Sequence, residues 1–168
     1  LGKFTNHGYK VPFDIGNSCR KGILAMMSGI PNKSANDKYS NGNGGLMRIP
    51  PLAFMHIEND EELLDYIKLF NECSHNHEIS NIGCLIYIRL AERLICGEDI
   101  KTALTNVVYS IDNRYKIPEY FRIWNLSILS ANIDEVMSSG FVVDTLEASI
   151  WCCGNNKTYK GATLSAVN

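Results

Sequence analysis

The chain has 168 residues, 45% of them hydrophobic, which is long enough for one well-buried core and short for two. We therefore expect a single domain over residues 1–168. Its formal net charge of -2, from sixteen basic and eighteen acidic residues, gives no electrostatic signal for nucleic acid or for an anionic membrane surface. The first residues carry no apolar signal-peptide region and no apolar run approaches membrane-spanning length, so we expect a cytoplasmic protein.

Apolar residues recur at helical spacing through most of the chain, and residues typical of helix starts precede many of these stretches. Helices are predicted over residues 14–29, 45–56, 60–73, 77–96, 99–110, 118–130, 144–153 and 159–167, with a polar loop over residues 30–44. Asn59, followed three residues later by Glu62, is expected to cap the third of these helices. The helix over residues 77–96, which ends before Gly97, is expected to be the central buried one.

Strand signals are sparse. Only residues 140–143 (Gly-Phe-Val-Val) are strand-like, and they are too short and isolated to build a sheet. The sequence therefore predicts an all-α fold with its helices packed around one core.

The six cysteines are scattered along the chain, and none form a Cys-x-x-Cys pair. Several lie within apolar helical patterns, so we interpret them as reduced core residues of a cytosolic protein. The adjacent Cys152 and Cys153 are assigned to the core as well.

The segment from Ser40 to Arg48 is the most informative part of the chain. Three of the four residues from Gly42 to Gly45 are glycine, and this composition allows left-handed backbone conformations and close approach to a ligand. The apolar onset at Leu46 predicts a helix whose free N–H groups face the loop and favour an anion. Ordinary turns have a similar composition, so a turn remains the alternative. The glycine spacing poorly supports a P-loop or a Rossmann site.

Polar residues also gather at other predicted helix starts. Asp144 and Glu147 are interpreted as capping residues. For Asp14 and Asn17 both a cap and a functional role stay open, because the Asp-Ile-Gly-Asn segment offers more donors and acceptors than a cap requires.

Two histidines and one arginine are further candidates. Alternate residues such as His75 and His77 point in different directions at a helix boundary, and no recognisable ligand set completes a metal site around them. A histidine beside a helix start can instead donate to phosphate or sugar oxygens, or satisfy a loop carbonyl. Arg48 is expected to form a structural ion pair, with a phosphate contact as the alternative.

Four ordered segments resemble the ADP-ribosylglycohydrolase family, which includes the ADP-ribosylarginine hydrolases and the dinitrogenase reductase-activating glycohydrolase. These segments are residues 13–18 (FDIGNS), 41–52 (NGNGGLMRIPPL), 74–75 (SH) and 140–148 (GFVVDTLEA). The resemblance runs through nearly the whole chain. It implies an orthogonal multi-helix bundle, incomplete at both ends, and a hydrolase that uses two magnesium ions to remove ADP-ribose from a modified protein side chain.

The resemblance also implies roles for individual residues. The diphosphate of ADP-ribose would lie on Ser40, Gly42, Asn43 and Gly44. His75 would lie against the ADP-ribose.

Three further positions follow from the same resemblance. Phe141 falls where relatives often carry Tyr, so it would form an aromatic wall against the adenine or ribose without the hydroxyl contact. Asp14 and Asn17 would lie near the scissile ribose or the acceptor side chain.

The magnesium ligands are the point where this chain departs from the family. Their motifs are a Thr-Asp-Asp run upstream of the Asp-x-Gly-Asn segment and a Gly-Asp-x-Asp-Thr run directly after an Ala-Val-Asn-like stretch. The chain contains neither motif, and it stops at Ala166, Val167 and Asn168. We therefore expect a chain truncated at both ends, with metal ligands outside it and little or no turnover by itself. A metal-free ADP-ribose binding module or regulatory pseudoenzyme is the alternative, and a helical scaffold without a ligand is the third possibility.

Overall fold

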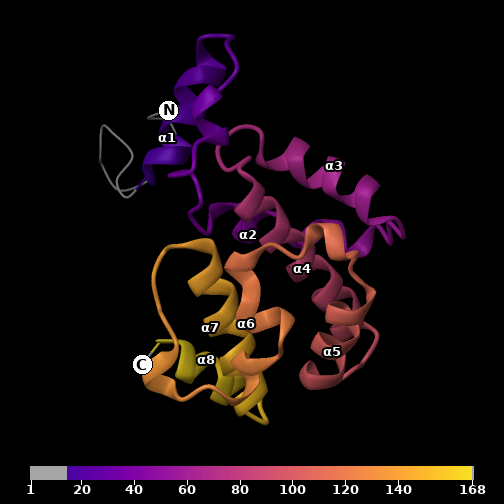
Figure 1. The fold of residues 1–168 in the computed structure, drawn as a ribbon. Coiled ribbons are helices and arrows are strands. Elements are labelled where there is room, and N and C mark those ends of the chain that lie inside the picture. Colours follow the sequence, from indigo (N-terminus) through magenta and orange to yellow (C-terminus); the bar gives the residue numbers. More distant parts are fainter. Residues whose placement is uncertain (1–14, 168) are drawn as a thin grey trace.

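The computed structural model describes residues 15–167, apart from the side chain of Ser34. Within this range the regular elements are α-helices and short 3-10 helices (η), so the predicted all-α fold is confirmed (Figure 1). The α-helices are α1 (Asn17–Met27), α2 (Gly44–Arg48), α3 (Asp60–Asn71), α4 (Glu78–Ile95), α5 (Ile100–Ser110), α6 (Phe121–Trp124), α7 (Val142–Asn155) and α8 (Tyr159–Val167). The 3-10 helices are η2 (Lys33–Asn36), η3 (Pro50–Phe54), η4 (Asn113–Tyr115), η5 (Pro118–Tyr120), η6 (Ser127–Ser130) and η7 (Ile133–Glu135).

Helix α4 is the centre of the fold, as its apolar pattern predicted. It packs against α2, α3, α5 and α7, and its residues Cys84, Leu85, Ile86 and Ile88 are completely buried. Figure 1 shows it running between α3 and α5, with α1 and α8 at opposite ends of the molecule. Because helix α4 touches both α2 and α7, it fixes the positions of the two helices that flank the glycine-rich loop.

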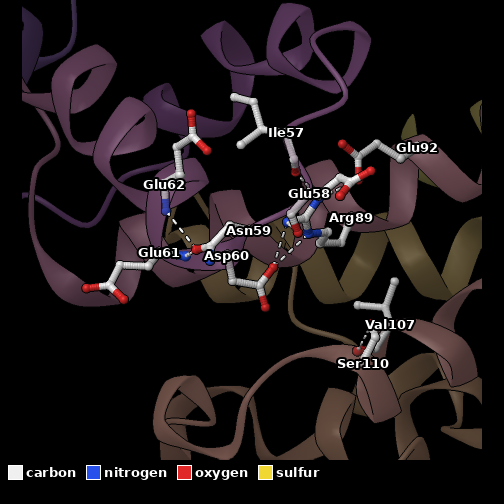
Figure 2. Close-up of polar contacts among 10 residues, drawn as sticks. All are labelled: Ile57, Glu58, Asn59, Asp60, Glu61, Glu62, Arg89, Glu92, Val107 and Ser110. Atoms are coloured by element: carbon white, nitrogen blue, oxygen red, sulfur yellow. Dashed lines mark hydrogen bonds and ion pairs between the residues drawn. The ribbon is translucent and has the colours of Figure 1, made fainter.

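The start of α3 is held by a cap and by one arginine (Figure 2). The Oδ1 atom of Asn59 accepts hydrogen bonds from the backbone N–H groups of Glu61 (2.8 Å) and Glu62 (3.2 Å), which confirms the predicted cap. From α4, the Arg89 guanidinium donates to Asp60 Oδ1 (2.8 Å) and to the carbonyl oxygen of Ile57 (2.7 Å). The turn before α3 is therefore fastened directly to the central helix.

Tyr120 and Gly83 are in close contact inside the core. The Tyr120 hydroxyl donates to the carbonyl oxygen of Ile79 at 2.8 Å, and a Cβ added at Gly83 would collide with that hydroxyl. The same Cβ would lie 3.1 Å from a methyl carbon of Val142, at the start of α7. Gly83 thus lets both the tyrosine and the start of α7 approach α4.

Two predicted helices are broken in the structure. The helix predicted over residues 45–56 ends at Arg48, and a 3-10 helix follows from Pro50, which has no N–H to continue an α-helical ladder. The helix predicted over residues 118–130 divides into η5, α6 and η6, with Leu126 in the left-handed region (φ 63°). A left-handed residue cannot continue a right-handed helix, so the chain turns there.

The capping roles predicted for Asp144 and Glu147 are wrong. Helix α7 begins at Val142, so Asp144 lies in its first turn and accepts a hydrogen bond from the hydroxyl of Ser139. Glu147 lies in the next turn, where its buried carboxylate pairs with Arg122 at 3.3 Å. Burial raises the pKa of Glu147, the guanidinium of Arg122 opposes that shift, and Asp144 adds to it.

The cysteines differ in burial, and Cys19 and Cys73 are intermediate. All six lie in the described range and carry free thiols, and Cys84 and Cys152 are buried. Cys96 and Cys153 are exposed, so their assignment to the core is wrong.

Within residues 15–167, no helix combines the length and the apolar character needed to cross a membrane.

Candidate functional site

The glycine-rich loop is clamped to the start of α7 by a short antiparallel bridge. Gly42 pairs with Phe141, the Asn43 N–H donates to the carbonyl oxygen of Gly140 (2.9 Å), and the Val142 N–H donates to that of Asn41 (2.9 Å). The strand-like segment predicted at residues 140–143 is therefore one rung of backbone pairing, after which α7 begins. This rung places Phe141 beside the loop although the two are far apart in the sequence.

His75 packs against this loop as well. A Cβ built at Gly44 would lie 2.7 Å from the Cε1 atom of His75, and one at Gly42 would lie 3.3 Å from its Nε2 atom. Gly45 is also restricted, because its Cβ would lie 3.0 Å from the Oδ1 atom of Asn71. Real Cβ atoms rarely approach other groups so closely, so the loop needs glycine in order to pack on these side chains.

The loop does not use the left-handed conformations that its glycines allow. Among the described glycines, only Gly29 and Gly97 have positive φ angles. Gly42, Gly44 and Gly45 serve close approach and not a left-handed turn.

A chain of polar contacts lies behind His75. Its Nδ1 atom is 2.8 Å from the hydroxyl oxygen of Ser74, and that oxygen accepts a hydrogen bond of 2.7 Å from the Nη2 atom of Arg48. Burial, followed by the charge of Arg48, lowers the pKa of His75. In the described part of the chain, Arg48 makes no ion pair, so the predicted pairing with a carboxylate is replaced there by this hydroxyl contact.

Asn41 fastens the loop to the start of α4, a role that the sequence did not indicate. Its Nδ2 atom lies 3.1 Å from the Nδ1 atom of His77 and donates to the carbonyl oxygen of Lys38 (2.8 Å). Its Oδ1 atom accepts hydrogen bonds from both the N–H and the hydroxyl of Ser80. The Nδ1 atom of His77 also accepts the N–H of Ile79 at the start of α4, so His77 acts as a helix cap.

The remaining predicted site residues differ in their surroundings. Asn43 donates from its side chain to the hydroxyl of Thr145 in α7 (3.2 Å), and Ser40 is buried. Asn17 is an exposed residue at the start of α1, where Gly16 occupies the cap position without a side-chain cap. Asp14 lies outside the described residues.

An open depression of about 340 Å³ lies on the loop. It is lined by Lys38, Tyr39, Asn41, Gly42, Gly140 and Phe141. Phe141 is 38% exposed there, and the Lys38 ammonium lies 5.1 Å from the centre of the Tyr39 ring. Lys38 and Tyr39 were not singled out from the sequence as candidate site residues. Their position directly before the Ser-Asn-Gly segment, as a cation followed by an aromatic residue, could have indicated them.

The profile of one family, described as ADP-ribosylglycohydrolase, matches residues 2–168. The chain belongs to the ADP-ribosylglycohydrolase family. It is 24% identical over 157 residues to the ADP-ribosyl-[dinitrogen reductase] glycohydrolase of Rhodospirillum rubrum. The aligned region covers 94% of this chain and 49% of that protein. It is 28% identical over 160 residues to the ADP-ribosylarginine hydrolase Tri1 of Pseudomonas putida (strain GB-1). That alignment covers 93% of this chain and 41% of that protein. The chain thus spans half or less of the length of these curated relatives.

The magnesium ions implied by resemblance to the ADP-ribosylglycohydrolases do not fit the described residues. Magnesium prefers carboxylate oxygens together with water. The depression on the loop is instead lined by amide, backbone, ammonium and aromatic groups. Across residues 15–167, no group of three or more His, Cys, Asp or Glu side chains could hold a metal ion. The described loop therefore offers no set of magnesium ligands.

A second cleft, of about 470 Å³, lies beside Arg89 and contains several carboxylates (Figure 2). Both arginines of this cleft are paired, since Arg89 bonds Asp60 and Glu92 while Arg93 bonds Glu98 at 3.0 Å. The family motifs of the ADP-ribosylglycohydrolases lie at the glycine-rich loop instead.

Proposed function

We propose that this chain forms the ADP-ribose-binding part of a hydrolase that removes ADP-ribose from a modified protein side chain. One observation carries the proposal. His75 and Phe141, from two distant parts of the chain, both lie beside the loop over residues 40–44. The family resemblance assigns all three to ADP-ribose. Family membership supports the same ligand, because both relatives are named for removing ADP-ribose from protein.

The chemistry of the depression suits the diphosphate of ADP-ribose and one of its ring systems. The Lys38 ammonium lines the depression. Its positive charge favours the negatively charged diphosphate. Phe141 presents an exposed aromatic surface on which the adenine or the ribose can pack.

In this proposal the described residues bind and orient ADP-ribose. Asn41 and Asn43 hold the loop in place through their side chains. The groups that cleave the glycosidic bond, together with Asp14 and any magnesium ligands, are assigned to residues outside the described range. From the family resemblance, Asn17 is proposed to lie near the scissile ribose or the acceptor side chain.

Isothermal titration calorimetry of the 168-residue chain with ADP-ribose tests the binding step. We expect saturable binding that weakens about tenfold in Phe141→Ala, because stacking of a base on an aromatic side chain contributes roughly 1–3 kcal/mol. Tyr109→Ala, which removes a 79% exposed aromatic side chain on α5, is the matched control and should bind like the unmodified chain. Absence of heat at millimolar ADP-ribose would contradict the proposal.

The cleavage step is tested with the full-length parent protein and magnesium. ADP-ribosylated arginine and serine peptides are incubated with it, and released ADP-ribose is measured. Release from either peptide supports the hydrolase. Binding by the parent without release from any acceptor would instead identify a binding module.

A further inference from the structure

We propose that Arg48 and Ser74 are positioning residues that hold His75 as the neutral tautomer with its proton on Nε2. That N–H then faces the turn between Gly42 and Gly44, where it donates to an oxygen of an anionic ligand. The identity of this ligand, a nucleoside diphosphate, rests on the proposed function. The tautomer depends only on contacts within the chain.

The direction of the hydrogen bonds decides the tautomer. A guanidinium has only donors, so the Ser74 hydroxyl oxygen must accept from Arg48 at 2.7 Å. The hydroxyl proton can then go to His75 Nδ1 at 2.8 Å or to the Cys73 sulfur at 3.6 Å. An unprotonated imidazole nitrogen is the closer and stronger acceptor of the two. Nδ1 therefore accepts the hydroxyl proton, and the proton of the neutral ring is on Nε2.

The surroundings keep the ring neutral. His75 is 4% exposed and Ser74 is 1% exposed, so a charged imidazolium would be poorly solvated. The guanidinium of Arg48, held one hydroxyl away, repels a second positive charge. Burial and this repulsion act in the same direction.

The Nε2 atom is the ring nitrogen of His75 that does not contact Ser74. It lies 3.3 Å from the Cβ position at Gly42 and 3.1 Å from that at Gly44, so it faces the predicted diphosphate loop. The hydrogen bond to Ser74 occupies Nδ1, at the opposite side of the ring from the loop. An N–H on Nε2 can therefore donate to an acceptor that the ligand brings to the loop.

Nitrogen-15 NMR of the imidazole rings tests the tautomer without any ligand. We expect His75 to show a protonated Nε2 and an unprotonated Nδ1 near neutral pH. Ser74→Ala removes the hydroxyl that donates to Nδ1 and should give a mixture of tautomers. Ser74→Thr, which keeps the hydroxyl, should restore the original signals. The exposed His56 serves as an internal reference whose signals should be the same in all variants.

Arg48 is tested by a matched pair of variants. Arg48→Lys keeps a cationic donor and should keep the Nε2 tautomer, whereas Arg48→Met should lose it. A protonated Nδ1 in the unmodified chain, or an Nε2 tautomer that persists in folded Ser74→Ala, would overturn the proposal. Circular dichroism of each variant establishes that it is folded.

Binding of ADP-ribose and of inorganic pyrophosphate provides the second readout. Ser74→Ala should weaken both about tenfold, and Ser74→Thr should bind within about twofold of the unmodified chain. If the unmodified chain binds neither compound, the proposed function fails while the tautomer result stands. If Ser74→Ala changes the tautomer and leaves both affinities unchanged, the donor role of Nε2 is overturned.

Discussion

Gly44 and His75 pack so closely that no side chain fits between them. A Cβ at position 44 would lie 2.7 Å from the His75 Cε1 atom and 3.1 Å from its Nε2 atom. The φ angle of Gly44 is not positive, so its glycine character reflects this contact and not backbone strain. The loop and the histidine are therefore one packed unit.

Replacing Gly44 with Ala should destabilise the fold by about 1–3 kcal/mol, because the added methyl group overpacks a buried ring. Urea unfolding measures the change. Gly140→Ala is the matched control, since its Cβ would meet nothing within 4 Å, and we expect a change within about 0.5 kcal/mol. In a His75→Ala background the cost of Gly44→Ala should fall, because the two residues are in direct contact. Equal costs in both backgrounds would contradict the packing argument.

Gly83→Ala should also destabilise the protein by about 1–3 kcal/mol, since its methyl group would collide with the Tyr120 hydroxyl. Tyr120→Phe alone should cost about 1 kcal/mol, because it removes the hydrogen bond to Ile79. The double variant should be more stable than the sum of the single effects predicts, since the phenylalanine lacks the colliding oxygen. Thermal unfolding of the four proteins measures this coupling, and strict additivity would count against it.

The lowered pKa of His75 makes stability depend on pH. Below pH 6.5 the unfolded chain binds a proton at this histidine while the folded chain resists it, so the unfolded state binds more protons. The stability contribution is thus fully present above pH 6.5 and is lost as the pH falls toward the lowered value. His75→Gln should flatten this part of the curve of unfolding free energy against pH. An unchanged slope in the variant would show that His75 titrates alike in both states.

Arg122→Met should leave the carboxylate of Glu147 buried without its cation. The side chain of Glu147 is 7% exposed and that of Arg122 is 30% exposed, so we expect a loss of about 1–3 kcal/mol, less than for a fully buried pair. Burial already raises the pKa of Glu147, and without Arg122 that pKa should rise further. The loss should therefore be largest above the folded pKa and shrink as the pH falls and Glu147 becomes protonated.

Two variants complete this test. Glu147→Gln combined with Arg122→Met should recover much of the stability at pH 7, because the uncompensated charge is gone. Arg93→Met is the comparison at a more exposed pair, in which the side chains of Arg93 and Glu98 are 32% and 29% exposed. We expect its loss to be smaller. A recovery that fails in the double variant would indicate that Arg122 acts through its bond to the carbonyl oxygen of Glu135 instead.

Local signals explain which elements could be predicted. The helix over residues 60–73 and the helix over residues 77–96 have continuous apolar spacing and clear start signals, and the structure contains both as α3 and α4. The helix after residue 140 begins two residues earlier than predicted. At its start the Val142 N–H donates to the carbonyl oxygen of Asn41, far away in the sequence. Such a contact leaves no residue pattern near position 142 from which the helix start could be predicted.

The sequence by itself determined the helical class, the central helix and the family, because spacing, caps and ordered motifs are local or directly readable. It also singled out the glycine-rich loop. Only the tertiary structure decided why Gly44 must be glycine and that Asn41, Ser74 and Arg48 support the loop and His75. These relationships arise where helices α2, α4 and α7 pack together, and packing between distant segments depends on shape that no short stretch of sequence encodes.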